Sequence, residues 1–295
     1  MNVLLAVDGS DSSHEAARAL AHLARPDKLV VLHVSDVPAP MYPSVVPEVA
    51  REIQDTITKT LREEGERLLH RITSVLPPNI GPVKKRLEIG NPTTAILDVA
   101  AQEDAHLILM GSRGVGQVRE LTLGSVSHRV ASHARCPVLV VGAPVRALRH
   151  VLLTVETPED ADVAVTYLKA RPFCETPEVT VLTVIPYVTP AWPVGTMIPE
   201  AYRKDLVRQA GEFVIGIASQ LATAGYRAKG EAVLGAPAVE ILREASKRRV
   251  DLIMVGSPSK GVTRLFLGSV SHSVLHKASC SVLAVRSPIG KAPAQ

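Results

Sequence analysis

Short aliphatic runs recur along the chain, separated by longer stretches in which apolar residues return with a helical period. In the N-terminal half, the aliphatic runs predict strands near residues 2–7, 28–34, 82–88, 106–110 and 137–141. The stretches between and after them predict helices near residues 11–24, 47–75, 93–103 and 125–133. Because the strands are apolar on both faces, we expect a parallel sheet that is covered by helices on both sides.

The C-terminal half repeats this order. The word LGSVSH stands at residues 123–128 and again, letter for letter, at 267–272. Further aliphatic runs predict strands near residues 150–155, 179–184, 227–233, 251–255 and 281–285. We therefore predict an α/β fold with two tandem domains, residues 1–144 and 149–287, each an open five-stranded parallel sheet with right-handed crossovers. Ligands of such sheets bind beyond the carboxyl ends of the strands.

Composition narrows the class of protein. Hydrophobic residues make up 46% of the chain and charged residues 21%, which is ordinary for a globular protein. Aromatic residues are only 3% and the net charge is +4, so we expect no nucleic-acid partner. No apolar run reaches the length of a membrane span, and the N-terminus reads as a first strand and not as a signal peptide. We expect a cytoplasmic protein without a membrane partner.

A glycine-rich loop, GSRGVGQVRELTLGS, follows the fourth predicted strand and leads into the helix that begins near Ser125. Glycines allow a ligand to approach the backbone, and a helix start offers amide donors and the positive end of the helix dipole to an anion. The loop is neither a Walker A loop nor a Rossmann fingerprint, because it follows the fourth strand. Ser125 could alternatively serve only as a helix cap.

With these features the sequence resembles the universal stress protein family in its tandem two-domain form, over about residues 1–143 and 149–287. The resemblance rests on the strand order, on Asp8 after the first strand, on LHV in the second, and on the spacing Gly-x2-Gly-x9-Gly-Ser. It implies a Rossmann-like fold similar to that of the adenine nucleotide alpha hydrolases. The loop is typical of the ATP-binding branch, so the resemblance implies ATP, with AMP or ADP as alternatives and Mg²⁺ as a companion ion.

The resemblance also implies which residues surround the nucleotide in the first half. Asp8 would lie near the ribose and adenine, Val34 would hold the base through its backbone, and the word around Ser125 would wrap the phosphates. The full set is Ala6, Val7, Asp8, Val34, Met110, Gly111, Gly114, Gly124, Ser125, Val126 and Ser127. Asp8 could alternatively cap the helix that follows the first strand.

The second half carries an incomplete version of this pattern. Glu156 replaces Asp8, Ser259 replaces Gly114, and Pro258 stands where the first loop has Arg113. We therefore predict a weaker or absent second nucleotide site, although Lys260 could reach a phosphate. Its candidate residues are Glu156, Val184, Gly256, Gly268, Ser269, Val270 and Ser271.

Other chemistry is less well supported by the sequence. Ser127 and His128 are helix neighbours and do not face each other, so we expect no hydrolase dyad and no catalytic residue. His272 and His276 have the i, i+4 spacing of a metal-binding pair, but no Glu follows as in HExxH. In addition, the residue of the first half that corresponds to His276 is Ser132. We therefore expect no metal. Pro-rich segments at residues 35–50 and 185–201 either cover a site or dock on a partner.

Three functions remain open from the sequence. The first is a cytoplasmic stress-response or signalling module whose bound ATP biases its conformation or its choice of partner. The alternatives are a slow ATPase or nucleotidyl-transfer enzyme, which lacks an evident general base beyond Asp8, and a nucleotide-free interaction scaffold. In all three cases the resemblance implies that the apolar last strands of the two domains pair within the chain, and we expect a homodimer.

Overall fold

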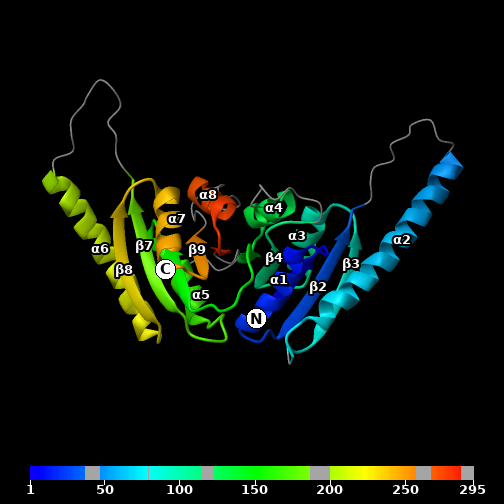
Figure 1. Cartoon of the computed structure of the whole chain (residues 1–295), viewed down its shortest axis with the longest axis horizontal. Helices are drawn as coiled ribbons and strands as arrows, with labels where there is room; N and C mark the ends of the chain where they lie inside the picture. Colours follow the sequence, from blue (N-terminus) through cyan, green and yellow to red (C-terminus); the bar gives the residue numbers. More distant parts are fainter. Residues whose placement is uncertain (37–46, 79, 115–122, 187–199, 257–266, 287–295) are drawn as a thin grey trace, which may run out of the picture. The chain divides into compact units, whose positions relative to one another are not determined.

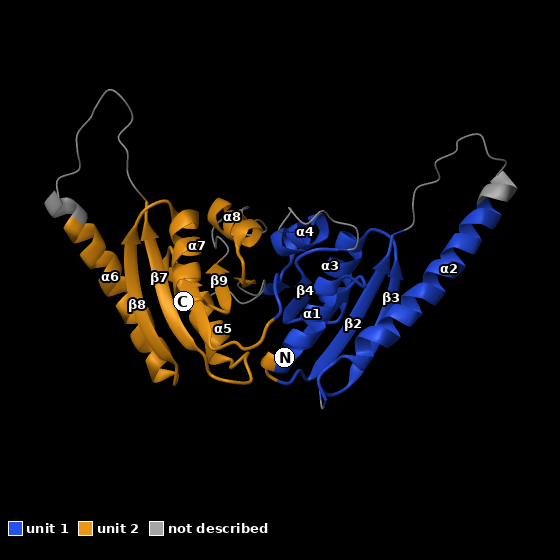
Figure 2. Cartoon of the chain, in the orientation of Figure 1, with its two compact units in different colours: residues 1–21, 25–144 blue, residues 22–24, 145–295 orange. Residues whose placement is uncertain are grey.

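The computed structural model describes residues 1–36, 47–78, 80–114, 123–186, 200–256 and 267–286. The chain divides into two compact units, shown in separate colours in Figure 2. Unit 1 comprises Met1–Ala21 and Arg25–Pro144, and unit 2 comprises His22–Ala24 and Val145–Gln295.

Unit 1 contains five parallel strands in the order β3-β2-β1-β4-β5. They are β1 (Asn2–Val7), β2 (Lys28–Ser35), β3 (Val83–Ile89), β4 (Leu107–Gly111) and β5 (Val138–Val141). The helices that connect them are α1 (Asp11–Ala19), α2 (Pro47–Ser74), α3 (Pro92–Gln102) and α4 (Ser125–His133). The helix predicted over residues 11–24 is shorter, because its last turn tightens into the 3-10 helix η1 (Leu20–His22).

Unit 2 repeats this arrangement with the order β8-β7-β6-β9-β10. Its strands are β6 (His150–Thr154), β7 (Glu178–Ile185), β8 (Arg227–Leu234), β9 (Leu252–Gly256) and β10 (Ser281–Val285). Its helices are α5 (Pro158–Lys169), α6 (Glu200–Thr223), α7 (Pro237–Arg248) and α8 (Ser269–Lys277). Helices lie on both faces of each sheet (Figure 1), so the predicted α/β class and the predicted parallel sheets are confirmed.

The core is aliphatic, as the composition predicts. The largest fully buried side chains include Leu4 and Leu5 on β1, Ile108 on β4 and Leu152 on β6. Strands β4 and β10 are buried at every residue, because helices cover both faces of the sheet. Among the described residues, no helix is long and apolar enough to cross a membrane.

An ion pair joins the third strand to the third helix in each unit, with opposite polarity. In unit 1, Arg86 on β3 lies 3.1 Å from Glu103, which follows α3 and also binds Lys28 at 2.6 Å and Lys84 at 2.7 Å. Glu103 is only 7% exposed, and its hydrogen bonds to Lys28 and Lys84 lower the pKa of its carboxyl from 4.5 to about 2. In unit 2 the acid is on the strand instead, where Glu231 on β8 pairs with Arg248 on α7.

Candidate functional site

The order of the strands in unit 1 reverses between β1 and β4, and the candidate site lies at the carboxyl ends of these two strands. Asp8 follows β1 directly and is exposed. Its carboxylate accepts a hydrogen bond from the backbone amide of Ser10 at 3.0 Å and from the Ser10 hydroxyl at 2.6 Å. Ser10 in turn caps α1 by accepting from the Ser13 amide. Ser10 is therefore the helix cap, and the alternative in which Asp8 is the cap is wrong.

Gly9 makes the tight turn between β1 and α1. Its φ of +81° lies in the left-handed region that side chains other than glycine rarely adopt. A Cβ at this position would also stand 3.1 Å from Leu68 of α2. The glycine therefore allows α2 to pack close to the turn that carries Asp8.

The glycine-rich loop begins beside this turn. The Ser12 hydroxyl donates to the carbonyl oxygen of Arg113, and the Ser10 hydroxyl lies 3.0 Å from the same oxygen. A Cβ added to Gly114 would stand 2.7 Å from Oδ2 of Asp8. The structure thus brings Gly114 and Asp8 into direct proximity, although they are far apart in the sequence. Residues 115–122 of the loop lie outside the described residues.

Gly111 has a packing role at the end of β4. A Cβ at Gly111 would come within 2.6 Å of the carbonyl carbon and 2.8 Å of the carbonyl oxygen of Ser12. The Ser127 hydroxyl is buried and donates to the Gly111 carbonyl oxygen at 2.8 Å. The side chain of Ser127 therefore ties α4 to β4, which leaves its backbone amide as the group that could face a ligand.

The start of α4 offers backbone donors. Gly124 is the N-cap and makes no side-chain capping bond, whereas Ser125 is exposed as the first helical residue. The alternative in which Ser125 is the cap is therefore wrong. The first amides of a helix have no acceptor within the helix, so those of Ser125, Val126 and Ser127, together with the positive end of the helix dipole, have the chemistry that an anion site needs.

A hollow of about 400 Å³ lies next to Asp8, at the carboxyl ends of β1 and β2. Asp8 and Val34, both of which the resemblance implied, line it. The lining residues are Asp8, Gly9, His33, Val34, Ser35, Asp36, Leu61, Glu64, Leu68 and Arg71. The other strand candidates, Ala6 and Val7 on β1 and Met110 on β4, have buried side chains within the sheet.

Helix α2 supplies one wall of the hollow, and the sequence did not indicate it. Leu61, Glu64, Leu68 and Arg71 recur at intervals of three and four residues, which places them on one helix face. That spacing was visible in the sequence. However, a mixed polar and apolar face is also typical of an ordinary surface helix, so only the packing of α2 beside Asp8 assigns it to the site.

His33 fixes the floor of the hollow between β1 and β2. Its Nδ1 lies 2.8 Å from the carbonyl oxygen of Val7, and its Nε2 lies 3.2 Å from the Ser35 hydroxyl. A Cβ at Gly65 of α2 would stand 3.0 Å from the His33 ring. The glycine thus lets α2 approach the strand ends closely enough to enclose the hollow.

The corresponding edge of unit 2 is built differently. Glu156 is exposed after β6, and the next residue, Thr157, already caps α5 by accepting from the Asp160 amide at 3.2 Å. A Cβ at Gly256 would stand 3.1 Å from the carboxyl carbon of Asp160, whose pKa is raised by burial. Unit 2 therefore places an acid where unit 1 places Ser12.

The second LGSVSH, in unit 2, keeps the local geometry that the first has in unit 1. Gly268 caps α8 without a side chain, Ser269 is exposed, and Val270 is half-buried beside it. The Ser271 hydroxyl donates to the Gly256 carbonyl oxygen at 2.8 Å, as Ser127 does to Gly111. Val184 is half-buried near the end of β7. Pro258, Ser259 and Lys260 lie outside the described residues, as do most of the two Pro-rich segments.

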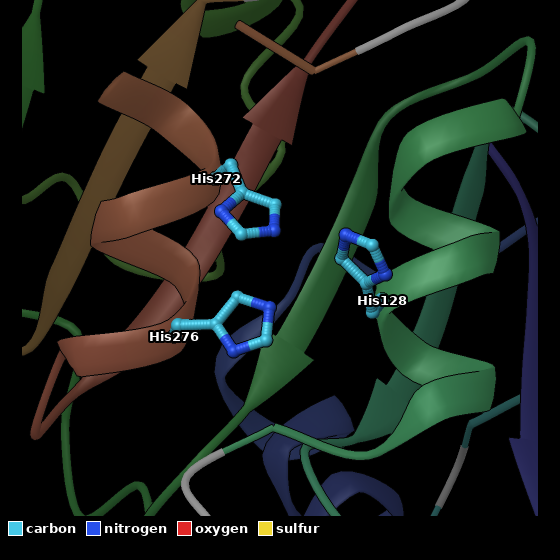
Figure 3. A group of neighbouring side chains, drawn as sticks. All are labelled: His128, His272 and His276. Atoms are coloured by element: carbon cyan, nitrogen blue, oxygen red, sulfur yellow. The ribbon is translucent and has the colours of Figure 1, made fainter. Parts of the chain in front are cut away.

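Three histidines lie on the helices that begin within the repeated words: His128 and His272 end the two words, and His276 follows one turn later on α8. In Figure 3, His272 and His276 project from α8, and His128 projects from α4. The rings of His272 and His276 lie side by side, with centroids 4.4 Å apart and planes tilted by 34°. Ser132 occupies the position on α4 that matches His276.

Comparisons with known proteins agree with this architecture. The model of the family described as the universal stress protein family matches residues 1–142 and 147–286. Universal stress protein YxiE of Bacillus subtilis is 33% identical over 143 residues, which covers 97% of that protein and 47% of this chain. A universal stress protein of Thermus aquaticus is 37% identical over 144 residues, covering 96% of that protein and 47% of this chain.

A solved structure covers both units at once. A universal stress protein from Archaeoglobus fulgidus matches 98% of this chain and 97% of its own, with a TM-score of 0.62 and 19% sequence identity. At this identity, the likeness shows the tandem fold alone.

Proposed function

Because the chain belongs to the universal stress protein family, and so has a role in the stress response, we propose that unit 1 binds one adenine nucleotide, ATP, and acts as a nucleotide-dependent stress module. The observation that carries this proposal is that Gly114 of the loop meets the carboxylate of Asp8, a residue that lines the hollow. Because Gly114 has no side chain, its backbone lies directly beside the Asp8 carboxylate. A ligand can therefore contact both from the hollow.

The hollow fits the base and the sugar of a nucleotide. Its volume of about 400 Å³ lies within the range of small-molecule sites, about 300–1,000 Å³. Leu61 and Leu68 offer apolar contacts to a planar base, and the Asp8 carboxylate accepts hydrogen bonds from ribose hydroxyls. Asp8 keeps acceptor capacity for this purpose, because a carboxylate has about four lone-pair sites.

The phosphates would face the start of α4. The amides of Ser125, Val126 and Ser127 and the positive helix end suit an anion, and Gly124 at the cap leaves room for it. The Ser125 hydroxyl, which is exposed, adds a donor, whereas the Ser127 hydroxyl is bound to Gly111. The chemistry of this donor set therefore fits the phosphate chain of ATP through backbone groups and one side chain.

Unit 2 is a weaker candidate for the same ligand. It retains the helix start at Gly268, but Asp160 lies against Gly256 at the beginning of the loop. An acid at this point repels a phosphate, and Glu156 replaces Asp8 with a longer side chain. We therefore propose one nucleotide per chain.

Calorimetric titration of the full chain with ATP tests this stoichiometry, and mass spectrometry of the denatured purified protein tests for ATP or AMP that copurifies. We expect one equivalent per chain. Two equivalents would contradict the weaker second site. The absence of both copurified nucleotide and measurable ATP affinity would contradict the proposal itself and leave the scaffold alternative.

The variant Gly114→Ala tests the site in unit 1 directly. Its Cβ would displace the Asp8 carboxylate, which is exposed and can move, so we expect at least a tenfold loss of ATP affinity and a stability change below about 1 kcal/mol. Calorimetry gives the affinity and urea denaturation gives the stability.

Gly211→Ala on α6 is the matched control, because no atom lies within 4 Å of its added Cβ. It should leave ATP affinity unchanged and raise helix stability by about 0.5–1 kcal/mol. Unchanged ATP affinity in Gly114→Ala would remove the loop from the site.

A further inference from the structure

We propose that His272 and His276 on α8 bind a divalent transition-metal cation of the zinc, nickel and copper class. The observation is the pairing of two imidazoles on one face of α8, outside the nucleotide site of unit 1. Their ring centroids lie 4.4 Å apart, and a ring nitrogen of one lies within 4.8 Å of a ring nitrogen of the other. The inference does not depend on the proposed nucleotide.

The distance between the two rings suits a shared cation. Two bonds of about 2.1 Å at the tetrahedral angle place the ligand nitrogens about 3.4 Å apart. The structure places a ring nitrogen of His272 within 4.8 Å of one of His276, so a closing movement of at most about 1.4 Å brings them to this separation. Side-chain rotation provides that movement, because His272 is exposed and His276 is half-buried. Water or an external ligand then completes the coordination.

The residue types decide the class of cation. Neutral imidazole suits Zn²⁺, Cu²⁺ and Ni²⁺, whereas Mg²⁺ and Ca²⁺ prefer oxygen ligands. The negative end of the α8 dipole also favours a cation beside His276 in the last turn. Lys277 follows His276 directly, but adjacent helical residues do not face each other.

The sequence argued against a metal because the pair lacks the Glu of an HExxH motif. That Glu serves as a general base in metalloprotease chemistry and is not a metal ligand. Its absence therefore excludes that catalytic role and leaves cation binding open. Helix α4 carries the same word with Ser132 in place of the second imidazole, so the two-histidine site belongs to unit 2.

The test uses untagged, full-length protein titrated with Zn²⁺ by calorimetry and with Cu²⁺ by electron paramagnetic resonance. We expect one tight equivalent per chain, with two nitrogen ligands in the Cu²⁺ spectrum. His276→Ser, which gives α8 the residue that α4 has, should weaken Zn²⁺ binding at least tenfold. It should also reduce the number of histidine nitrogens in the Cu²⁺ spectrum.

A second variant and a control keep the test decisive. His272→Ala removes the exposed member of the pair and should cause the same loss without affecting packing. His133→Ala on α4, an exposed histidine whose Nδ1 lies 2.8 Å from the Arg129 carbonyl oxygen, should leave binding unchanged. Wild-type Zn²⁺ affinity in both His276→Ser and His272→Ala would overturn the proposal.

Discussion

Unit 1 and unit 2 join their third strand and third helix with the same kind of ion pair, but the charges have changed places. Arg86 on β3 binds Glu103 after α3, whereas Glu231 on β8 binds Arg248 on α7. Lys28 at the start of β2 also corresponds to an acid, Glu178, at the start of β7. The repeat therefore retains the contact between the elements and not the residue types that make it.

At the carboxyl ends of the strands the opposite holds: the residue types are retained but their surroundings differ between the two units. The words that start α4 and α8 are identical, and both glycine caps lack a side-chain bond. The turns beside them differ, because unit 1 has Gly9 and Ser12 where unit 2 has Thr157 and Asp160. Identical letters therefore do not make equivalent sites when the neighbouring turn has changed.

Charge reversal at one member of the ion pair should have the largest effect. Glu103→Arg places a fourth cation among Lys28, Lys84 and Arg86, and we expect unit 1 to lose about 3 kcal/mol of stability. Hydrogen exchange followed by mass spectrometry measures this loss in the peptides of β3 and α3.

The double variant Arg86→Glu, Glu103→Arg reproduces the polarity of unit 2. If the contact matters more than its sign, the second change should recover at least about 1 kcal/mol of the loss. Recovery of nothing would show that Lys28 and Lys84 determine the polarity in unit 1.

The next largest difference in stability between the two units should come from adding a methyl group at the last residue of β4 or of β9. In Gly111→Ala the Cβ meets backbone atoms of Ser12, which cannot move alone, so we expect a loss of about 2 kcal/mol. In Gly256→Ala the described atoms nearest to the Cβ belong to the Asp160 side chain, at 3.1–3.2 Å, so we expect less than about 1 kcal/mol. Urea denaturation of both variants gives the comparison, and equal losses would contradict the difference in packing.

The smallest expected effect is a change in the stability of unit 1 at acid pH, which depends on Glu103. The pKa of Glu103 is lowered to about 2 in the folded chain, so its stabilisation is complete above the ordinary value of 4.5 and is lost as the pH falls towards 2. Because Lys28 and Lys84 are partly exposed, solvent screening limits this contribution to about 1 kcal/mol. Denaturant midpoints between pH 5 and pH 2 should fall more steeply for the wild type than for Glu103→Gln. Parallel curves would exclude this role.

Burial raises the pKa of Asp160 in unit 2, so its linkage has the opposite sign. Its ionisation costs stability as the pH rises above the unfolded value. Asp160→Asn should therefore remove the stability loss that develops in unit 2 as the pH rises above 3.8, and denaturant midpoints measured from pH 2 to pH 7 test this.

Local pattern was sufficient to predict most of the fold. The aliphatic runs located the strands to within one or two residues, because a parallel sheet covered on both sides needs apolar residues at every position. Only the predicted helix after β1 extended too far, since apolar periodicity does not distinguish an α-helical turn from the 3-10 turn of η1. The nucleotide, the pairing of the last strands, the homodimer and the cytoplasmic location stay predictions.

The candidate site was less predictable from the sequence. Asp8 and Val34 were identified through the resemblance and do line one hollow. The wall formed by Glu64 and Arg71 was missed, because an exposed helix face carries no sign of the strand end that it approaches. Ser127 was expected at the phosphates, but its hydroxyl binds Gly111, since a buried donor needs an acceptor nearby.

The sequence by itself determined the strands, the repeat, the family and the two helix starts that can face an anion, because each of these depends on residues that are close in the chain. Only the tertiary structure decided that Ser10 caps α1, that Gly114 meets Asp8, and that Asp160 takes the place of Ser12 in unit 2. The histidine pair on α8 depends on both: the sequence determines the spacing of His272 and His276, and the packing of their side chains determines the separation of the rings. Contacts between distant segments depend on side-chain volume and approach distance, which no local pattern records.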